Sequence, residues 1–281
     1  MYDAACPSEA ATETPQRARG ELRIGFGLRD GATALRDLYQ SGCLKARFPR
    51  PERGGAPVAV LLNTAGGIAG GDRLRTAIHV AAGARLTVTT QAAERLYRAR
   101  PADLPAAIET SLHLEDAALL DWLPQETILF DRAAARRRLT IDLAASATFT
   151  GVETLVLGRR AMGETVDRAS WHDLIRLRRD GRLLLHDAVR LDGAAATHLA
   201  GPATAGGAGA VATLIHAGPE AEGLLDPLRA CLAGHDAGAS AWDGLLVARI
   251  LAADSARLRP PVMAGLAVLR PGRALPRIWH T

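Results

Sequence analysis

The stretch of sequence that decides the fold class reads Ala106-Ala107-Ile108-Glu109-Thr110-Ser111-Leu112-His113-Leu114-Glu115. Ile108, Thr110, Leu112 and Leu114 occupy every second position, and Glu109, Ser111, His113 and Glu115 fill the positions between them. Successive side chains of a strand point to opposite faces of a sheet, so a period of two predicts a half-buried β-strand.

The same period recurs along the chain up to about residue 217. Residues 74–80 alternate, the turn-like Ala81-Ala82-Gly83 follows, and residues 85–89 alternate again, which predicts a hairpin. Residues 139–143 repeat the pattern. Many short strands separated by turn signals indicate a mainly β fold.

A second hairpin is predicted over residues 171–191, because Asp180-Gly181 tolerates the positive φ of a two-residue turn. Such a loop pairs His186 with Ile175 and leaves His172 on the opposite face from His186. The two histidines can share a site only if a bulge shifts the register.

The C-terminal quarter has a different pattern. Asp226-Pro227 is typical of a helix N-cap and first helical residue, with Gly234 as the stop. After a strand at residues 245–251, one helical face carries Leu258, Val262, Leu266 and Leu269, with Pro260 and Pro261 expected in the first turn. The Gly/Ala-rich residues 201–209 are expected to form a loop.

These patterns predict one β-rich domain over residues 20–281, with its substantial helices after about residue 218. The polar residues 1–19 have no apolar core of a signal peptide and are expected to be a disordered leader. No apolar stretch approaches the roughly 20 residues that span a bilayer, so a cytoplasmic protein without membrane contact is expected. Cys6, Cys43 and Cys231 are far apart, which favours a reducing compartment over disulfides or a structural zinc site.

Charge leaves one rival function open. The chain has 281 residues, a net charge of +4 and 34 basic residues, of which Lys45 is the only lysine. Arginine binds phosphate well, so an arginine-rich nucleic-acid-binding β protein is an alternative. Acidic residues are interleaved throughout, however, and the run Arg136-Arg137-Arg138 is the sharpest exception. The interpretation preferred here is therefore a protein without nucleic-acid partners.

A glycine cluster over residues 65–72 follows an apolar run. A phosphate loop would end in Gly-Lys-Ser/Thr, but Asp72 stands there and would repel phosphate. A dinucleotide fingerprint needs a following helix, whereas the next segment alternates as a strand. A tight connection where backbones approach closely is the plain interpretation.

The sequence contains no nucleophile elbow and no histidine pattern typical of a metal site. Glu126, Asp131, Glu153 and Glu164 are scattered carboxylates that nothing favours for paired acid–base work. We therefore expect no enzyme activity, no catalytic or cofactor-binding residue and no metal ligand set. A hydrolase that uses the glycine-rich loop stays as a second alternative.

Four segments in order resemble the UreD (UreH) family of urease accessory proteins, and the resemblance runs from about Gly20 to Trp279. They are residues 61–72 (LLNTAGGIAGGD), 89–98 (TTQAAERLYR), 122–130 (WLPQETILF) and 157–164 (LGRRAMGE); residues 246–249 and 275–279 also resemble the family's close. Many members carry prolines before the first glycine pair, where this chain has Asn63-Thr64-Ala65.

The resemblance implies a two-layered, helical, solenoid-like arrangement of stacked strands with a few helices. It implies a non-enzymatic scaffold that binds urease apoprotein, the accessory protein UreF and, through it, the GTPase UreG. Nickel would be in transit along an internal path, with no cofactor bound tightly, which suits a chain without clustered soft ligands. The signature positions, expected to serve structure or the handling of ions and partners, are Gly66, Gly67, Gly70, Gly71, Asp72, Gln91, Glu126, Gly163 and Glu164.

Overall fold

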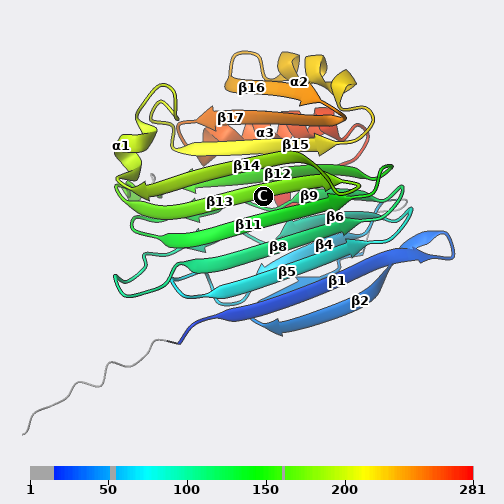
Figure 1. The fold of residues 1–281 in the computed structure, drawn as a ribbon, viewed down its shortest axis with the longest axis horizontal. Coiled ribbons are helices and arrows are strands. Elements are labelled where there is room, and N and C mark those ends of the chain that lie inside the picture. Colours follow the sequence, from blue (N-terminus) through cyan, green and yellow to red (C-terminus); the bar gives the residue numbers. More distant parts are fainter. Residues whose placement is uncertain (1–15, 51–54, 160–161, 281) are drawn as a thin grey trace, which may run out of the picture.

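The computed structural model describes residues 16–50, 55–159 and 162–280, and they form two stacked β-sheets (Figure 1). The first is seven-stranded, in the order β14 (Arg182–Gly193), β13 (Ala169–Arg179), β11 (Ala134–Leu143), β8 (Ala106–Leu114), β5 (Arg73–Val80), β1 (Arg19–Arg29) and β2 (Ala32–Gly42). The second is ten-stranded: β16 (Asp236–Trp242), β17 (Leu245–Ala252), β15 (Ala210–Ala217), β12 (Thr148–Leu157), β9 (Leu119–Leu123), β6 (Arg85–Thr90), β4 (Val58–Asn63) and β3 (Leu44–Arg47), with β7 (Glu94–Leu96) and β10 (Thr127–Leu129) beside this path.

The chain alternates between the two layers as it advances. β5, β8, β11 and β13 are parallel neighbours in one sheet, whereas β4, β6, β9 and β12 are parallel neighbours in the other. Each turn of chain therefore adds one strand to each sheet, which is a two-layered helical arrangement. The expected mainly β fold is confirmed.

The hairpin predicted over residues 74–89 is wrong. β5 belongs to the seven-stranded sheet and β6 to the ten-stranded sheet, so the turn at residues 81–84 crosses between layers instead of pairing the strands. Alternation of residue types shows that one face of each strand is buried, and it does not distinguish a hairpin from an arch between two sheets.

The second predicted hairpin is confirmed, but its register is not. Asp180 and Gly181 have φ values of 49° and 77°, and β13 pairs antiparallel with β14. A bulge between Leu177 and Arg178 pairs His186 with Arg176, not with Ile175. The shift puts both histidines on the outer face, where His172 pairs with Arg190 and its Nε2 lies 2.8 Å from Asp192. They lie four positions apart on the ladder and form no shared site.

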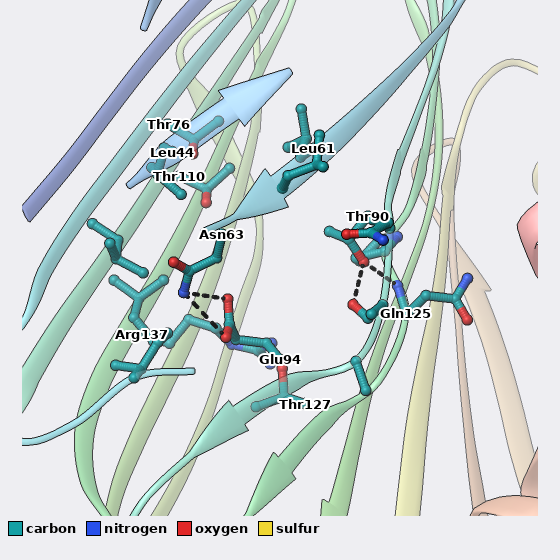
Figure 2. Close-up of a pocket in the computed structure, with 18 of the residues that line it drawn as sticks. Leu44, Leu61, Asn63, Thr76, Thr90, Glu94, Thr110, Gln125, Thr127 and Arg137 are labelled. Atoms are coloured by element: carbon teal, nitrogen blue, oxygen red, sulfur yellow. Dashed lines mark hydrogen bonds between the residues drawn. The ribbon is translucent and has the colours of Figure 1, made fainter. Parts of the chain in front are cut away.

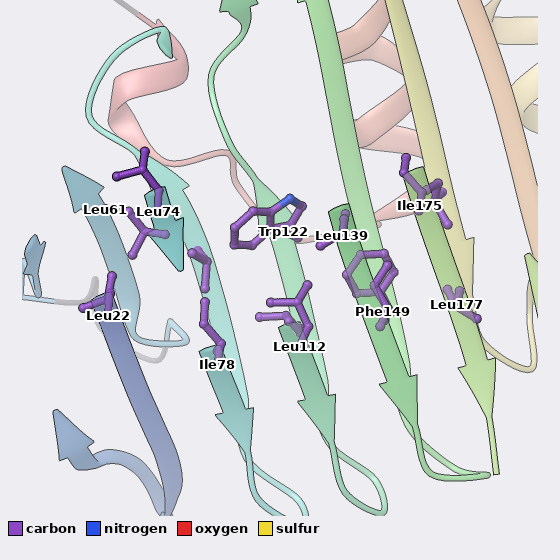
Figure 3. Packing of buried hydrophobic residues seen from close by; sticks show 14 of the residues in the cluster. Leu22, Leu61, Leu74, Ile78, Leu112, Trp122, Leu139, Phe149, Ile175 and Leu177 are labelled. Atoms are coloured by element: carbon purple, nitrogen blue, oxygen red, sulfur yellow. The ribbon is translucent and has the colours of Figure 1, made fainter. Parts of the chain in front are cut away.

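The core lies between the sheets and follows from the period-2 pattern. Inward residues of successive strands stack in rows: Ile78 pairs with Leu112, and Leu112 pairs with Ile141. Trp122 and Phe149 of the other sheet complete this apolar layer (Figure 3). A second apolar cluster lies on the far side of the ten-stranded sheet, where Leu258, Val262, Leu266 and Leu269 of α3 (Ser255–Leu269) are buried as predicted.

The helices begin earlier than the sequence suggested. α2 (Leu225–Cys231) follows the 3-10 turn η2 (Glu222–Leu224) and already contains Asp226 in its first turn. Asp254 caps α3 by accepting from the backbone N of Arg257, so Pro260 and Pro261 lie in the second turn, inside the helix. The short α1 (Ala195–Leu199) was not predicted, and the 3-10 turn η3 (Arg277–His280) ends the described chain.

At the N-terminus, residues 1–15 of the expected leader lie outside the described residues. Residues 17–19 contact the rest of the protein: Arg17 pairs with Asp103, and Arg19 already begins β1. Across the described ranges, none of the helices has the length and apolar character needed to cross a bilayer.

Candidate functional site

The four signature segments, separate in sequence, meet at one end of the two sheets. Ile68 of the glycine loop forms a bridge with Leu96 at the end of β7, β7 pairs with β10, and β10 pairs with β12. The contacts continue through side chains, because Tyr97 Oη donates to the carbonyl of Gly66 at 3.0 Å and its ring packs edge-on against Phe130. The segments therefore form one continuous ladder.

Asp72 fastens the glycine loop. Its carboxylate is buried and accepts hydrogen bonds from the backbone N of Ala18 and of Ala69, each at 2.8 Å. Gly67 has a φ of 145°, and a Cβ there would lie 2.3 Å from the Tyr97 ring, so no larger residue fits. At Gly70 a Cβ would lie 2.8 Å from that of Asp103. Close approach of neighbouring groups to the backbone therefore explains Gly67 and Gly70, in agreement with the tight connection expected from the sequence.

The loop forms part of the rim of a cavity between the two sheets. This inter-sheet cavity has a volume of about 300 Å³ and reaches solvent beside the exposed Gly66, Gln91 and Ala92. Its wall mixes apolar side chains with polar ones, including Thr76 and Thr110 of the seven-stranded sheet (Figure 2).

Glu94 supplies a carboxylate to the cavity wall. Asn63 Nδ2 donates to both of its oxygens, at 3.3 and 3.1 Å (Figure 2). Burial raises the pKa of Glu94, and the hydrogen bonds from Asn63 and from the backbone of Arg95 oppose that rise. Carboxylate oxygens are a type of ligand that divalent cations accept, and this one has a neutral amide as its side-chain partner.

Of the signature residues Gln91 and Glu126, the first lines the cavity and the second does not. Gln91 borders the cavity and donates its backbone N–H to the carbonyl of Leu61 at 2.9 Å. Glu126 accepts the backbone N–H of Glu94 through its carbonyl at 2.9 Å, and its carboxylate lies 3.9 Å from Arg259. Glu126 therefore supports the segment that carries Glu94.

Gly163 and Glu164 lie outside the cavity wall. Gly163 has a φ of 72°, and the Glu164 carboxylate accepts from Nε of Arg159 at 2.9 Å. Arg159 lies over the Phe130 ring, 4.4 Å from its centroid, which joins this turn to the signature ladder. Of the nine signature residues, Gly66, Gly67 and Gln91 border the cavity.

Sequence reasoning missed the inner end of the cavity, where Arg137 of β11 meets Glu153 of β12. The Nη1 atom of Arg137 lies 2.5 Å from Oε2 of Glu153, and Nε lies 2.8 Å from Oδ1 of Asp173. Nε1 of Trp122 donates to the other oxygen of Glu153 at 2.7 Å. All three charged side chains are buried or nearly so.

Burial sets the charge state of this group. Burial alone would lower the pKa of Arg137. The carboxylates of Asp173 and Glu153 raise this pKa by more than burial lowers it, so the guanidinium stays charged. Burial raises the pKa of Glu153, and Arg137 opposes the rise. One signal was available in the sequence: Arg137 shares the inward phase of β11 with Leu139 and Ile141, where a charge is unexpected.

Beyond Arg137 lies a second cavity of about 30 Å³, room for about one water molecule. Arg137 and Glu153 line both cavities. Asp187 of β14 and Arg249 of β17 form its far side and pair at 2.6 Å, and the Arg249 side chain is 41% exposed. Polar side chains therefore line both cavities between the sheets, from the opening beside Gln91 to the partly exposed Arg249.

Within the described ranges, no three His, Cys, Asp or Glu side chains are grouped so as to hold a metal ion. The geometry defines a two-layered β protein whose apolar core contains a partly polar cavity.

Comparison with known proteins gives this scaffold its family. Residues 18–280 match the family model described as UreD urease accessory protein. The chain is 50% identical over 275 residues to the urease accessory protein UreD of Methylobacterium sp. (strain 4-46), covering 95% of this chain and 96% of the relative. It is 46% identical to UreD of Rhizobium leguminosarum bv. trifolii (96% and 98% covered) and 47% identical to UreD of Xanthobacter autotrophicus (99% and 96% covered).

The chain belongs to the UreD family of urease accessory proteins. It acts in urease maturation and nickel incorporation and is not itself a catalyst. The resemblance carried by the four segments is confirmed.

Proposed function

We propose that nickel passes through the inter-sheet cavity of this protein on its way to urease apoprotein. The observation that carries the proposal is the cavity itself: about 300 Å³ between two sheets, with Glu94 on its wall and the Arg137–Glu153 pair at its inner end. Oxygen ligands that are few and spaced apart suit a cation that must leave again.

The protein would work in the cytoplasm as a scaffold, bound to urease apoprotein and to UreF, and through UreF to the GTPase UreG. GTP hydrolysis would belong to UreG, because the loop that ends in Asp72 carries no phosphate-binding lysine. The nine signature residues would hold the cavity rim and its supporting ladder in place. Residues 20–281 would act as one domain.

The proposal is tested by the nickel content of urease. A strain without this gene should make urease that is largely nickel-free, and the purified protein should hydrolyse neither urea nor GTP. Complementation with Glu94→Gln should give normal amounts of soluble accessory protein but urease with less nickel. Full nickel loading with Glu94→Gln would remove Glu94 from the path, and full loading in the deletion strain would end the proposal.

A further inference from the structure

Arg137 and Glu153 both line the inter-sheet cavity and the second cavity, so they form a wall between the two. The side chain of Arg137 extends from β11 in one sheet to Glu153 on β12 in the other. The guanidinium also pairs through Nε and Nη2 with Asp173 on the neighbouring β13, and Nη1 lies 3.3 Å from the Thr127 hydroxyl. A side chain held in this way closes the interior at this point.

The charges around the guanidinium resemble a cation site that an arginine has filled. Glu153 and Asp173 both direct oxygens at one positive group, and their side chains are only 9% and 12% exposed. Two carboxylates with a single arginine leave a formal charge of −1. A divalent ion between the same two carboxylates would leave the group neutral, and carboxylate oxygens are ligands that such ions accept.

The second cavity lies on the side of Arg137 toward Asp187, the acid that the displaced arginine would approach. Asp187 lines that cavity, and its present partner Arg249 is partly exposed, so Arg249 can turn toward solvent. Nε1 of Trp171, which lines the same cavity beneath Arg137, is buried without a hydrogen-bond partner. A buried indole N–H of this kind indicates that the space is suited to water or to a polar group.

We propose that Arg137 is a displaceable plug over a two-carboxylate site, Glu153 and Asp173, which takes a divalent transition-metal ion such as Ni²⁺ when the arginine moves toward Asp187. This inference rests on the proposed passage of nickel, and it assigns the point where passage is controlled. With Arg137 in place the two cavities are separate, and with Arg137 displaced they join.

A plug of this kind would weaken metal binding by a predictable factor. A site that is open about 1% of the time binds its ion about a hundredfold less tightly than a site held open. Removing the arginine should therefore tighten Ni²⁺ binding by at least about tenfold.

The test is equilibrium dialysis of the purified full chain against NiCl₂, which needs no urease. Arg137→Met keeps an unbranched, flexible side chain and removes the guanidinium with its charge, and it should bind at least about tenfold more Ni²⁺ at limiting concentration than the wild type. The triple variant Arg137→Met/Glu153→Gln/Asp173→Asn should lose that gain. Binding to exposed histidines is the same in all three proteins and is subtracted by the comparison.

Thermal unfolding gives a second readout. Without metal, Arg137→Met should have a lower Tm than the wild type, because two buried carboxylates have lost their partner. Ni²⁺ should raise the Tm of Arg137→Met and leave that of the triple variant unchanged. Should Arg137→Met fail to fold, Arg137→Lys retains the charge without the planar fork, and its Ni²⁺ affinity should exceed that of the wild type.

Equal Ni²⁺ affinity in the wild type and in whichever arginine variant folds, or a gain that persists in the triple variant, would overturn the plug. These outcomes are separate from those of the urease experiment. A tightened site together with normal nickel loading in Glu94→Gln would keep the plug and remove Glu94 from the path.

Discussion

The carboxylate of Asp72 accepts a hydrogen bond from the backbone N–H of Ala18, 54 residues earlier in the chain, at 2.8 Å. Its second oxygen accepts from Ala69 within the glycine loop. One buried side chain therefore joins the start of β1 to the rim of the inter-sheet cavity. These two backbone hydrogen bonds are sufficient to explain why an aspartate ends the glycine cluster.

Replacing this acid should lower stability. Asp72→Ala leaves two backbone N–H groups without their acceptor, so the free energy of unfolding in urea should fall by about 2 kcal/mol. Soluble protein and urease activation should fall together. Asp226→Ala is the matched control, since that side chain is 94% exposed and should change little. An Asp72→Ala protein as stable as the wild type would contradict the structural role.

Glu164 gives a contrasting prediction. Its pair with Arg159 is partly exposed, so Glu164→Ala should cost less than about 1 kcal/mol. We expect urease activation to fall while the soluble protein level stays near normal, which assigns Glu164 to the handling of ions or partners. Glu21→Ala, which breaks the exposed pair with Arg23, is the control in the same assay. Unimpaired activation by Glu164→Ala would exclude a functional role.

The cysteines should be dispensable. Burial raises the pKa of the Cys43 thiol, so less thiolate is present at neutral pH to capture nickel. Cys43 and Cys231 are both free; Cys43 lies in the turn between β2 and β3, and Cys231 ends α2. The double variant Cys43→Ser/Cys231→Ser should activate urease at close to the wild-type rate. An inactive double variant of normal stability would show that thiolates do handle the ion.

Glu94 should make stability depend on pH in a definite direction. Its pKa is raised by burial from the ordinary value of 4.5, so the native protein holds this proton at pH values where the unfolded chain has lost it. Native stability therefore falls as pH rises from 4.5 through the raised pKa. Glu94→Gln has no such proton, and its stability relative to the wild type should increase across that window and then level off. Urea unfolding at several pH values measures the difference; a constant difference would contradict the burial of this carboxylate.

The strands were predictable because burial on one face leaves a period of two in each of them. The pairing was not: residues 74–80 and 85–89 look like a hairpin but lie in separate sheets. The bulge at Leu177 and Arg178 was likewise hidden, since neither residue type requires it. Partner choice depends on contacts far apart in sequence, and alternation contains no information about them.

The site was predictable only in part. The glycine loop and Asp72 follow from local backbone geometry, and their placement at a cavity rim does not. Arg137, Glu153 and Asp173 come from three strands, and nothing in their spacing brings them together. A charged residue in the apolar phase of a strand was the available signal, and Arg137 is such a residue.

The nickel content of purified urease, measured with accessory-protein variants that fill or spare the inter-sheet cavity, tests the central claim most directly. Thr110 faces the cavity, and Thr110→Phe would place an aromatic ring in its 300 Å³. Ser111 is its exposed neighbour on β8, so Ser111→Phe makes the matched change on the outer face. Passage through the cavity predicts urease with little nickel from the Thr110→Phe strain and normal nickel from the Ser111→Phe strain, at equal levels of soluble accessory protein. Full nickel loading with Thr110→Phe would contradict it.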